Sequence, residues 1–421
     1  MFPPPGGCFI LSKLYAKIRE KNKKARHILR IVSIIGARPQ FIKAAMVSRA
    51  IQSYNQKKKK GKISHIVIHT GQHYDYAMSQ AFFDQLPLPT PHYHLGVGSG
   101  NHGWMTGTML PRIESVLIEA RPDWVLVYGD TNSTLAGALT AAKMTVPLAH
   151  VESGLRSYNR QMPEEINRVL TDHISNLLFC PTRNSVKNLR KEGIKRGIYE
   201  TGDVMFDAFL TYRDKAVKKS KILSRYGLPP GNYSLATVHR QENTEDRSRL
   251  AGIFKAFEEI ATKENPLIVP LHPRTVSAIQ REKIHFTRNA YFQLISPLSY
   301  MDMLALVIQA KIILTDSGGV QKEAFFARVP CVTLRNETEW VETVQTGWNR
   351  LSGTEPEMII QAFDEAKKSN FQSAGGLFGD GKAAEKIVDL ILAHFPFELP
   401  SASSGFFTSN YKNKNSSRNH K

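Results

Sequence analysis

From residue 28 onward, apolar runs of five to eight residues alternate with segments of helical period and with short turns rich in Gly, Pro, Asn and Asp. Strands that are apolar on both faces are typical of a parallel sheet covered by helices on each side. The pattern predicts strands at 29–35, 64–69, 124–128 and 147–151, with helices between them at 39–53 and 131–144. These elements make one doubly wound α/β unit.

A second series with the same plan follows residue 208. It predicts strands at 233–238, 267–271, 311–315 and 331–334 and helices at 247–262, 299–309 and 319–328. Ligands of open α/β sheets bind beyond the carboxyl ends of the strands. The sequence therefore predicts two Rossmann-like units that face a central cleft, with the ligand between them.

The length of 421 residues suits two domains of ordinary size. We expect hinge motion between them near 201–208. The predicted division has five parts. They are a basic N-terminal extension at 1–27, an N-terminal Rossmann-like domain at 28–205, a C-terminal Rossmann-like domain at 206–383, a helix at 384–398 that packs back on the first domain, and a disordered basic tail at 399–421.

Hydrophobic residues make up 42% of the chain and charged residues 22%, which are values of a globular protein. The net charge of +19 gathers at the ends, since residues 1–30 hold eight lysines and arginines against Glu20 alone. Lys57 to Lys60 with Lys62 form a run that is typical of a solvated loop. No nucleic-acid partner is expected from this distribution.

No apolar run approaches the roughly 20 residues of a membrane span. The first apolar stretch precedes its charges, the reverse of a secretory signal, so we expect a cytoplasmic protein. The three cysteines, Cys8, Cys180 and Cys331, are widely spaced and include no CxxC pair. We therefore expect reduced thiols and no metal site.

The first predicted strand runs into the sequence GARPQFIK. Gly36 permits a tight turn, and Pro39 suits the first turn of a helix whose amides point outward. Arg38 and Lys43 flank this helix start and predict an anion site. The alternative is that both are surface cations beside a helix.

Acidic residues follow the strands 124–128 and 147–151. Asp130 and Glu152 stand at the two strand ends, and Glu164 stands at the head of a later helix. Crowded carboxylates raise one another's pKa, which suits acid–base catalysis near neutral pH. The alternative for Asp130 and Glu164 is a helix cap, the commonest use of an acid before a helix.

Histidines and arginines follow two strands of the second series. His239 and Arg240 follow strand 233–238, and His272 with Arg274 follows strand 267–271. Cations and imidazoles here complement an anionic ligand. The alternative is a pair of histidines that merely satisfy surface or core contacts.

The sequence TDSGGVQKEA begins at the end of strand 311–315. Gly318 and Gly319 let backbone amides and a helix N-terminus approach a diphosphate closely, Ser317 adds a donor, and Glu323 lies one helical turn further on. The segment lacks the GxxxxGK[ST] and GxGxxG patterns, so it indicates neither ATP hydrolysis nor hydride transfer.

With these residues in place, residues 28–395 resemble the non-hydrolysing UDP-N-acetylglucosamine 2-epimerases. The resemblance is carried, in the order and at the spacing typical of that family, by the segments GARPQFIK, TGQHYDYAMSQ, VYGDTNSTLAGA, HVESGLRS, MPEEINR, TGDVMFDA, TVHRQEN, LTDSGGVQKEA and LRNETEWVE. It implies a two-domain α/β fold of the glycosyltransferase-B type, which agrees with the plan predicted above.

The resemblance also implies roles for individual residues. Asp130, Glu152 and Glu164 would be the catalytic carboxylates, with His239 beside the diphosphate. A second, activating UDP-sugar would contact Gln72 and His73. The residues implied to hold the UDP part are Arg38, Lys43, Ser317, Gly318, Gly319, Glu323 and Arg335, and the strand-end pattern adds Arg240 and His272 as substrate-binding candidates. The resemblance implies no cofactor and a homodimer.

Five positions depart from the pattern of many family members. Ala37 and Gln40 stand where many have threonine and glutamate, and Trp340 and Val341 stand where many have arginine and proline. Met303 stands where some have an aromatic residue near the uracil. Gln40 and Trp340 resemble a subgroup that includes epimerases of UDP-2,3-diacetamido-2,3-dideoxyglucuronate. An acidic hexuronate would need further cations, for which Arg156, Arg160 and Arg274 are candidates.

The expected activity is thus the non-hydrolysing epimerisation of UDP-N-acetylglucosamine to UDP-N-acetylmannosamine, by elimination and re-addition of UDP through a 2-acetamidoglycal, for cell-surface polysaccharide precursors. The alternative substrate is UDP-2,3-diacetamido-2,3-dideoxyglucuronate. Alternatives in other classes are a hydrolysing epimerase, a glycosyltransferase of the same fold and an inactive UDP-sugar-binding protein.

Overall fold

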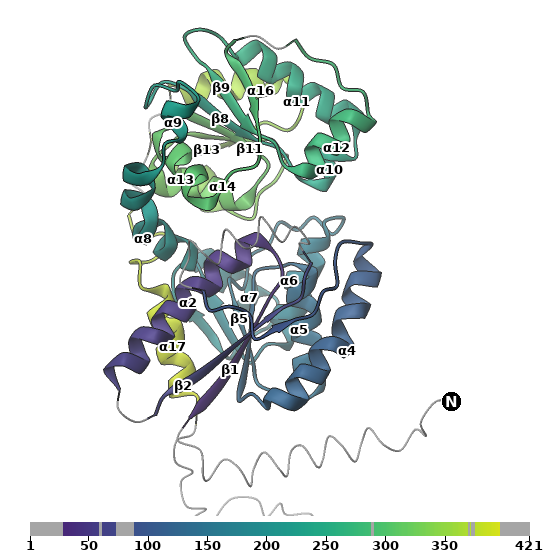
Figure 1. The fold of residues 1–421 in the computed structure, drawn as a ribbon, viewed down its shortest axis with the longest axis vertical. Coiled ribbons are helices and arrows are strands. Elements are labelled where there is room, and N and C mark those ends of the chain that lie inside the picture. The colour runs from purple at the N-terminus through teal and green to yellow at the C-terminus, as the bar shows by residue number, and fades with distance from the viewer. Residues whose placement is uncertain are drawn as a thin grey trace, which may run out of the picture.

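The computed structural model describes residues 28–58, 61–72, 88–287, 290–368, 371 and 375–395. They form two α/β lobes, one above the other in Figure 1. The extension at 1–27, the tail at 399–421, Cys8 and His73 lie outside the described residues. No helix within the described ranges is long and apolar enough to cross a membrane.

The first lobe is built on a seven-stranded parallel sheet in the order β3-β2-β1-β4-β5-β6-β7. Its strands are β1 (Leu29–Ile35), β2 (Ile63–His69), β3 (Tyr93–His94), β4 (Trp124–Tyr128), β5 (Leu148–Val151), β6 (Leu177–Cys180) and β7 (Ile198–Glu200). Its helices are α2 (Arg38–Lys57), α4 (His102–Ala120), α5 (Asn132–Lys143), α6 (Pro163–Ile174) and α7 (Arg183–Lys191). The winding direction reverses between β1 and β4.

The second lobe repeats this plan with six parallel strands in the order β10-β9-β8-β11-β12-β13. Its strands are β8 (Ser234–Thr237), β9 (Leu267–Pro270), β10 (Phe292–Ile295), β11 (Ile312–Thr315), β12 (Cys331–Thr333) and β13 (Asn349–Leu351). Its helices are α9 (Ile222–Arg225), α10 (Gln241–Thr244), α11 (Arg247–Ile260), α12 (Pro273–Arg281), α13 (Tyr300–Gln309), α14 (Gly318–Ala327), α15 (Val341–Gln345) and α16 (Pro356–Ala366). The doubly wound α/β architecture predicted from the sequence is confirmed.

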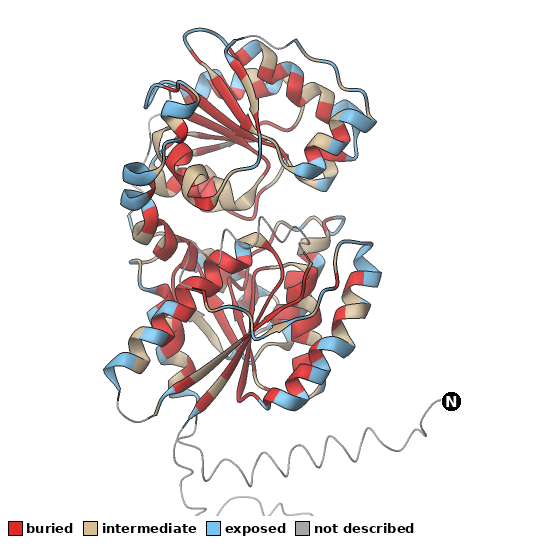
Figure 2. Ribbon diagram, in the orientation of Figure 1, coloured by how far each residue is buried: buried red, intermediate tan, exposed pale blue. Residues whose placement is uncertain are grey.

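Both faces of each sheet are covered, which explains why the central strands are largely apolar. In β1, Leu29, Ile31 and Ile35 pack in one core cluster while Val32 and Ile34 pack in another. Alternate residues of a strand point to opposite faces, so a strand between two helical layers buries nearly every side chain. Figure 2 shows the central strands of both lobes mostly as buried, whereas the outer strands β3, β7 and β13 are only partly buried.

Two chain segments that lie next to each other connect the lobes. Helix α8 (Val204–Lys219) leads from the first lobe to the second, and the chain returns through 375–382 to α17 (Ala383–Ala393), which packs on α2. Gly202 and Gly379 pack backbone to backbone there with φ of 88° and 92°, and a Cβ on Gly379 would lie 2.8 Å from the Gly202 Cα. Only glycine suits that approach and that conformation.

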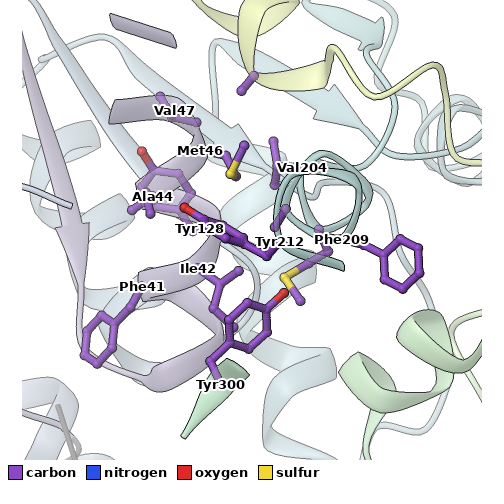
Figure 3. Close-up of a cluster of buried hydrophobic side chains, with 14 of the residues drawn as sticks. Phe41, Ile42, Ala44, Met46, Val47, Tyr128, Val204, Phe209, Tyr212 and Tyr300 are labelled. Carbon is purple, nitrogen blue, oxygen red and sulfur yellow. The ribbon is translucent and has the colours of Figure 1, made fainter. Parts of the chain in front are cut away.

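A single hydrophobic cluster runs through this junction. It contains β1 and α2 residues of the first lobe, α8, and residues of the second lobe such as Tyr300 and Leu304. Figure 3 shows Phe41, Tyr212 and Tyr300 in this cluster, and the Tyr212 and Tyr300 rings meet edge to face with centroids 6.1 Å apart. The two lobes therefore share apolar packing.

The predicted elements agree with the structure to within a few residues, but the structure has further strands, such as β6, β7, β10 and β13, and further helices, such as α7, α12 and α16, that were not predicted. Helix 39–53 extends to Lys57, so the lysine run begins inside α2 and not in a loop. The 19-residue helix α4 was not predicted; Gly103, Gly107 and Pro111 interrupt its helical pattern, although its buried positions still recur at helical spacing.

Candidate active site

The residues singled out in the sequence gather where the carboxyl ends of the two sheets face each other. Side chains bridge the lobes here: Arg38 donates to the Leu298 carbonyl at 3.0 Å, and Asn159 donates to Glu337 at 3.0 Å. Loops after β1 and β4, at the reversal of the first sheet, meet loops after β8 and β11, at the reversal of the second. These reversals are the positions at which open α/β sheets bind ligands.

A buried chain of charges crosses the interface. Lys43 Nζ donates to Glu152 Oε2, and Lys322 Nζ from α14 lies 2.5 Å from Glu152 Oε1 and 2.7 Å from Asp203 Oδ2. All four side chains are buried. Glu152 directly follows β5 and has φ of 73°, a conformation that is uncommon for a residue other than glycine. Such strain tends to occur at functional sites.

Lys43 is a buried lysine whose pKa is lowered. Burial, together with the nearby Lys322, lowers the pKa of Lys43 to about 7. Its burial and its contact with Glu152 distinguish Lys43 from a surface cation beside a helix.

Asp130 follows β4 and pairs with Arg168 of α6, whose Nε lies 3.1 Å from Asp130 Oδ2 and whose Nη2 contacts the same oxygen. The N-cap of α5 is Thr131, whose hydroxyl accepts from the Thr134 amide. Asp130 is therefore not a helix cap.

Asp130 and Glu152 both have cationic partners. Arg168 contacts Asp130, and Lys43 and Lys322 contact Glu152. Cationic neighbours favour the ionised form of a carboxylate.

Glu164 lies in the first turn of α6, where it is partly exposed, and Met162 is the N-cap of that helix. Its electrostatic influence reaches His239 and Arg240 of the second lobe. The next residue, Glu165, is buried and accepts the Ser157 and Tyr158 amides, each at 2.9 Å. Glu165 therefore organises the loop before α6, and Glu164 is the acid that faces the other lobe.

Asp316 organises the second lobe's histidine–arginine segment. Its carboxylate accepts the His239 amide at 3.0 Å, the Arg240 amide at 2.9 Å and the Asn243 side chain at 3.1 Å. Partial burial of the His239 ring, helped by Arg240, lowers the pKa of His239, while Asp316 opposes the shift. The His239 and His272 rings lie 5.6 Å apart, so the two strand-end histidines are neighbours.

Arg335 and Arg240 converge on Glu339. Arg335 donates to Glu339 Oε2 at 3.1 Å, and Arg240 Nη2 lies 3.6 Å from Glu339 Oε1. Burial alone would raise the pKa of Glu339, but Arg335, Arg240 and Arg168 hold it far below its usual range. Both arginines also reach Met162 Sδ across the interface, at 3.4 Å from Arg240 and 3.9 Å from Arg335.

The predicted phosphate loop is the N-terminus of α14. Ser317 is the N-cap and accepts the Val320 amide, and its hydroxyl proton stays available for a ligand. A Cβ on Gly318 would collide with Glu339 Oε1, whereas a Cβ on Gly319 would meet nothing nearer than Ser317 Oγ at 3.8 Å. Burial raises the pKa of Glu323, one turn on, to about 7 against the opposing effect of Lys322.

Gln72, the described member of the predicted regulatory pair, accepts the Ser133 amide at 3.1 Å and the Ser133 hydroxyl at 2.7 Å. It therefore braces the start of α5, next to Asp130. His272 is the N-cap of α12 through its Nδ1, which accepts the Arg274 amide at 3.2 Å.

Arg156 is not available to a sugar carboxylate. It is buried and donates to Asp172 at 2.7 Å and to Glu192 at 2.6 and 2.7 Å. Arg160 and Arg274 are exposed, Arg160 in the loop between β5 and α6 and Arg274 at the start of α12. Of the three candidates for an acidic sugar, only these two remain.

A cavity of about 580 Å³ lies apart from all of these residues, between α8, α14 and the segment 375–379. Phe206, Phe209, Phe325 and Phe378 are among its lining residues. The catalytic candidates do not border it.

Comparison with known protein families gives a match over residues 55–392 to the family described as UDP-N-acetylglucosamine 2-epimerase. The chain belongs to this epimerase family. A Methanococcus maripaludis protein named UDP-N-acetylglucosamine 2-epimerase homolog is 50% identical over 86% of this chain and 99% of its own length. The UDP-2,3-diacetamido-2,3-dideoxy-D-glucuronate 2-epimerase of Pseudomonas aeruginosa is 47% identical over the same shares.

Solved structures of the epimerase family have the same fold. The crystal structure of the Methanocaldococcus jannaschii UDP-GlcNAc 2-epimerase in complex with UDP-GlcNAc and UDP is 41% identical, with a TM-score of 0.81. It matches 87% of this chain and 100% of that one. The two lobes described here are therefore those of the epimerase family.

Two departures from the usual family pattern have a packing role here. Gln40 Oε1 accepts the Gly36 and Ala37 amides at 2.7 and 3.0 Å, and its Nε2 donates to the Tyr128 carbonyl at 2.8 Å. Trp340 is buried against Phe378, with its ring centre 4.1 Å from Lys322 Nζ. Neither departure is by itself evidence about the sugar.

The sequence did not single out Arg168, Asp203, Asp316, Lys322 or Glu339, although four of them contact candidate residues of the epimerase site and Asp203 contacts Lys322. Four of them stand inside the motifs MPEEINR, TGDVMFDA and LTDSGGVQKEA, and Glu339 stands in LRNETEWVE. Their membership of those motifs was the available signal. Their charge partners lie up to 170 positions away in the chain, so spacing could not reveal them.

Proposed function

We propose that this chain catalyses the non-hydrolysing epimerisation of UDP-N-acetylglucosamine at C2 to give UDP-N-acetylmannosamine, a precursor for cell-surface polysaccharides. The observation that carries the proposal is the apposition of catalytic and anion-binding groups across the lobes. Asp130, Glu152 and Glu164 come from the first lobe, and His239 and the α14 N-terminus come from the second. The M. jannaschii relative bound to UDP-GlcNAc and UDP supports the substrate class.

The chemistry requires departure of UDP. The C2 hydrogen of the sugar is not acidic, because C1 is an acetal carbon that cannot delocalise a carbanion. In the proposed reaction the C1–O bond to UDP breaks, a carboxylate takes the C2 proton, and a C1=C2 double bond forms in a bound 2-acetamidoglycal. A proton then adds to the opposite face of C2 while a UDP oxygen re-forms the bond to C1.

Two acid–base groups on opposite faces of C2 are needed, and Asp130, Glu152 and Glu164 are the candidates. Arg38, His239, Arg240, His272, Arg335 and the amides at Ser317, Gly318 and Gly319 would stabilise the diphosphate charge that develops as UDP leaves. Glu323 would contact the remainder of the UDP part.

Lys43 gives Glu152 a partner for proton handling. A proton taken by Glu152 has a contacting amine whose pKa is about 7. An amine with that pKa can accept or return a proton near neutral pH without a large free-energy cost. The pair would thus hold the C2 proton or its replacement while the glycal is bound.

The glycal must be kept from water and from losing UDP, so the two lobes must close on it. We place the hinge near residues 201–208, at the start of α8, and the boundary between the two proposed domains at 205/206. The regulatory role of Gln72 and His73 remains part of the proposal, as do the homodimer and a cytoplasmic location, where nucleotide sugars are made.

A second substrate has support from one relative. The P. aeruginosa UDP-2,3-diacetamido-2,3-dideoxy-D-glucuronate 2-epimerase is 47% identical to this chain, compared with 50% for the M. maripaludis UDP-N-acetylglucosamine 2-epimerase homolog and 42% for the M. jannaschii UDP-N-acetylglucosamine 2-epimerase. Arg160 and Arg274 are the exposed cations that would meet the uronate carboxylate.

Proton NMR in D₂O tests the proposal. The purified protein is incubated with each of the two UDP-sugars separately. Deuterium at C2 with appearance of the manno epimer from UDP-N-acetylglucosamine is the expected result, and conversion of the diacetamido uronate alone would replace the substrate but keep the reaction. A folded protein that binds UDP but exchanges neither sugar would contradict the proposal and favour a transferase or binding protein.

The Asp130→Asn variant tests the carboxylate assignment. We expect turnover to fall by about 10²–10⁴-fold, the usual contribution of general acid–base catalysis. The same NMR assay gives the rate, and a melting curve shows that the variant is folded. Near wild-type turnover by folded Asp130→Asn would remove Asp130 from the catalytic set.

A further inference from the structure

Lys322 lies at the centre of the interface between the lobes. It stands on α14 and is 1% exposed. Its ammonium group contacts Glu152 Oε1 at 2.5 Å and Asp203 Oδ2 at 2.7 Å, and the Trp340 ring centre lies 4.1 Å away. The Lys322 ammonium has three N–H donors. Two carboxylates accept hydrogen bonds from it, and the Trp340 ring makes a cation–π contact with it.

Glu152 is held from both lobes by these contacts. Lys43 of α2 binds one carboxylate oxygen from the same lobe, and Lys322 binds the other oxygen from the opposite lobe. With φ of 73°, the backbone of Glu152 aims the side chain at the interface directly after β5. The position and charge of Glu152 therefore depend on where α14 lies.

We propose that Lys322 is a positioning residue for Glu152: delivered by the second lobe, it holds this carboxylate ionised and oriented when the two lobes are together. The inference rests on the proposed function, because it takes Glu152 as a catalytic carboxylate. It assigns a role to Lys322, for which the family resemblance implied none, and it gives α14 a second function beside diphosphate binding.

The two tasks of α14 are mechanically linked. The N-terminus of this ten-residue helix carries the proposed diphosphate site at Ser317, Gly318 and Gly319, and Lys322 follows one turn later. A helix of this length moves as one body, so the position that lets its amides meet the diphosphate also brings Lys322 to Glu152. Glu152 is then ionised and oriented as a base only when the second lobe, which carries the proposed UDP site, is packed against the first.

The charged groups around Glu152 determine how removal of the Lys322 charge should change the protonation of Glu152 with pH. Lys43 faces it from α2, Lys322 from α14 and Asp203 from the start of α8, while Asp130 and Arg168 act on Lys43. Removing the Lys322 charge leaves Glu152 and Asp203 without their shared cation. A buried carboxylate that loses a neighbouring cation keeps its proton to higher pH.

Lys322→Met and Lys322→Arg test the proposal, with Lys255→Met as the matched control. Lys255 is an exposed lysine of α11 in the same lobe. For each variant we would measure kcat and KM for C2 epimerisation across pH, UDP affinity by calorimetry, and the melting temperature. Lys255→Met is expected to match the wild type.

Lys322→Met is expected to lower kcat by at least about tenfold, a part of the 10²–10⁴-fold that general acid–base catalysis contributes. The acidic limb of its kcat profile should move to higher pH, while UDP still binds because the α14 N-terminus is intact. Lys322→Arg keeps the charge, so its acidic limb should stay at the wild-type pH although kcat falls, because a guanidinium cannot reproduce the ammonium geometry.

A folded Lys322→Met variant with wild-type kcat and pH profile would overturn the proposal, and a lower melting temperature alone would reduce Lys322 to a structural tie. If Lys322→Met does not fold, Lys322→Arg decides, since wild-type kcat in that variant would also overturn it. Wild-type protein that binds UDP but exchanges no C2 hydrogen would refute the proposed function and this inference together. An active wild type with an unaffected Lys322→Met refutes the inference alone.

Discussion

Gln40 uses its whole amide group to hold two loops of the site together. Its oxygen accepts two amides of the β1–α2 turn, while its nitrogen donates to the Tyr128 carbonyl and, at 2.9 Å, to the Thr134 hydroxyl. The donor to the carbonyl is the part that a glutamate cannot supply when it is ionised. The residue that relatives commonly have here is therefore not equivalent in this chain.

Gln40→Glu should destabilise the protein by about 1–3 kcal/mol at neutral pH, because a buried carboxylate oxygen would replace the amide donor to the Tyr128 carbonyl, which would keep the Thr134 hydroxyl as its side-chain donor. A protonated glutamate could donate to the Tyr128 carbonyl, so its folded-state pKa should be raised. Its contribution to stability is then present at low pH and lost as the pH rises. Urea unfolding at pH 5 and pH 8 measures this; an equal loss at both pH values would refute the explanation.

Glu323 should make the ligand-free protein less stable as the pH rises. Burial raises its folded-state pKa from the ordinary value of 4.5 to about 7. A raised pKa contributes stability below 4.5 that is lost as the pH increases through about 7. Glu323→Gln should remove this contribution to the pH dependence of stability.

Melting temperatures of wild type and Glu323→Gln, taken without UDP between pH 5 and pH 8, provide the measurement. The result to compare is the difference in melting temperature between the two proteins at each pH. Burial also raises the pKa of Asp207 to about 6, so Asp207 lowers the melting temperature of both proteins as the pH rises. Parallel curves for the two proteins would show that Glu323 ionises at its ordinary pKa.

At this scale, the sequence predicted residues that directly follow strands, such as Asp130, Glu152 and His239, because strand ends of a parallel sheet share one edge. It did not predict their charge partners. Lys322 and Arg168 lie on helices, and which carboxylate each one meets depends on how the lobes and layers pack.

The N-terminus of α14 is the element on which the nucleotide assignment depends. Gly318 is required by the protein itself, because Glu339 is held by Arg335 and leaves no room for a Cβ. Gly319 has no such neighbour within the described protein. The reason for a glycine at 319 would then be the ligand.

The variants Gly318→Ala and Gly319→Ala distinguish a glycine required by protein packing from a glycine required by the ligand. Gly318→Ala should cost about 1–3 kcal/mol of stability, as expected for overpacking. Gly319→Ala should keep or raise the stability of the ligand-free protein, since alanine favours a helix by about 1 kcal/mol over glycine. It should nevertheless weaken UDP binding, because its methyl group would occupy the diphosphate site.

Melting curves and UDP calorimetry on both variants provide the measurements. Unchanged UDP affinity in Gly319→Ala would mean that the diphosphate does not approach these amides. The elements themselves were predictable where apolar strands alternate with regular helices. Helix α4 was not, because its glycines and proline lower its helical propensity and tertiary packing compensates for them.

At the scale of the molecule, the two lobes share one hydrophobic cluster through α2, α8 and α13. Independent domains usually meet through a smaller and more polar interface. Continuous packing couples the stability of one lobe to that of the other. The two-lobe plan followed from the repeated strand–helix pattern, but this shared core did not, since it depends on how the lobes come together.

We expect thermal unfolding as one cooperative transition despite the two sheets. Phe209→Ala, in α8, should lower the midpoint of the whole transition, because truncating a core phenylalanine costs about 3–5 kcal/mol. Differential scanning calorimetry tests this through the ratio of calorimetric to van't Hoff enthalpy, which should be close to one. Two resolved transitions, of which Phe209→Ala shifts one, would contradict the expectation.

The paired crossings between the lobes limit how they can move. The Asp203 amide donates to the Phe378 carbonyl at 2.9 Å, and the Asp207 carboxylate accepts the Ala383 and Ala384 amides at 3.1 and 2.8 Å. The outgoing and returning chains are thus fastened together along one side of the molecule. We therefore expect opening to be mainly a swing about this side of the molecule. A single distance between labels on the two lobes should then report how far the enzyme is open.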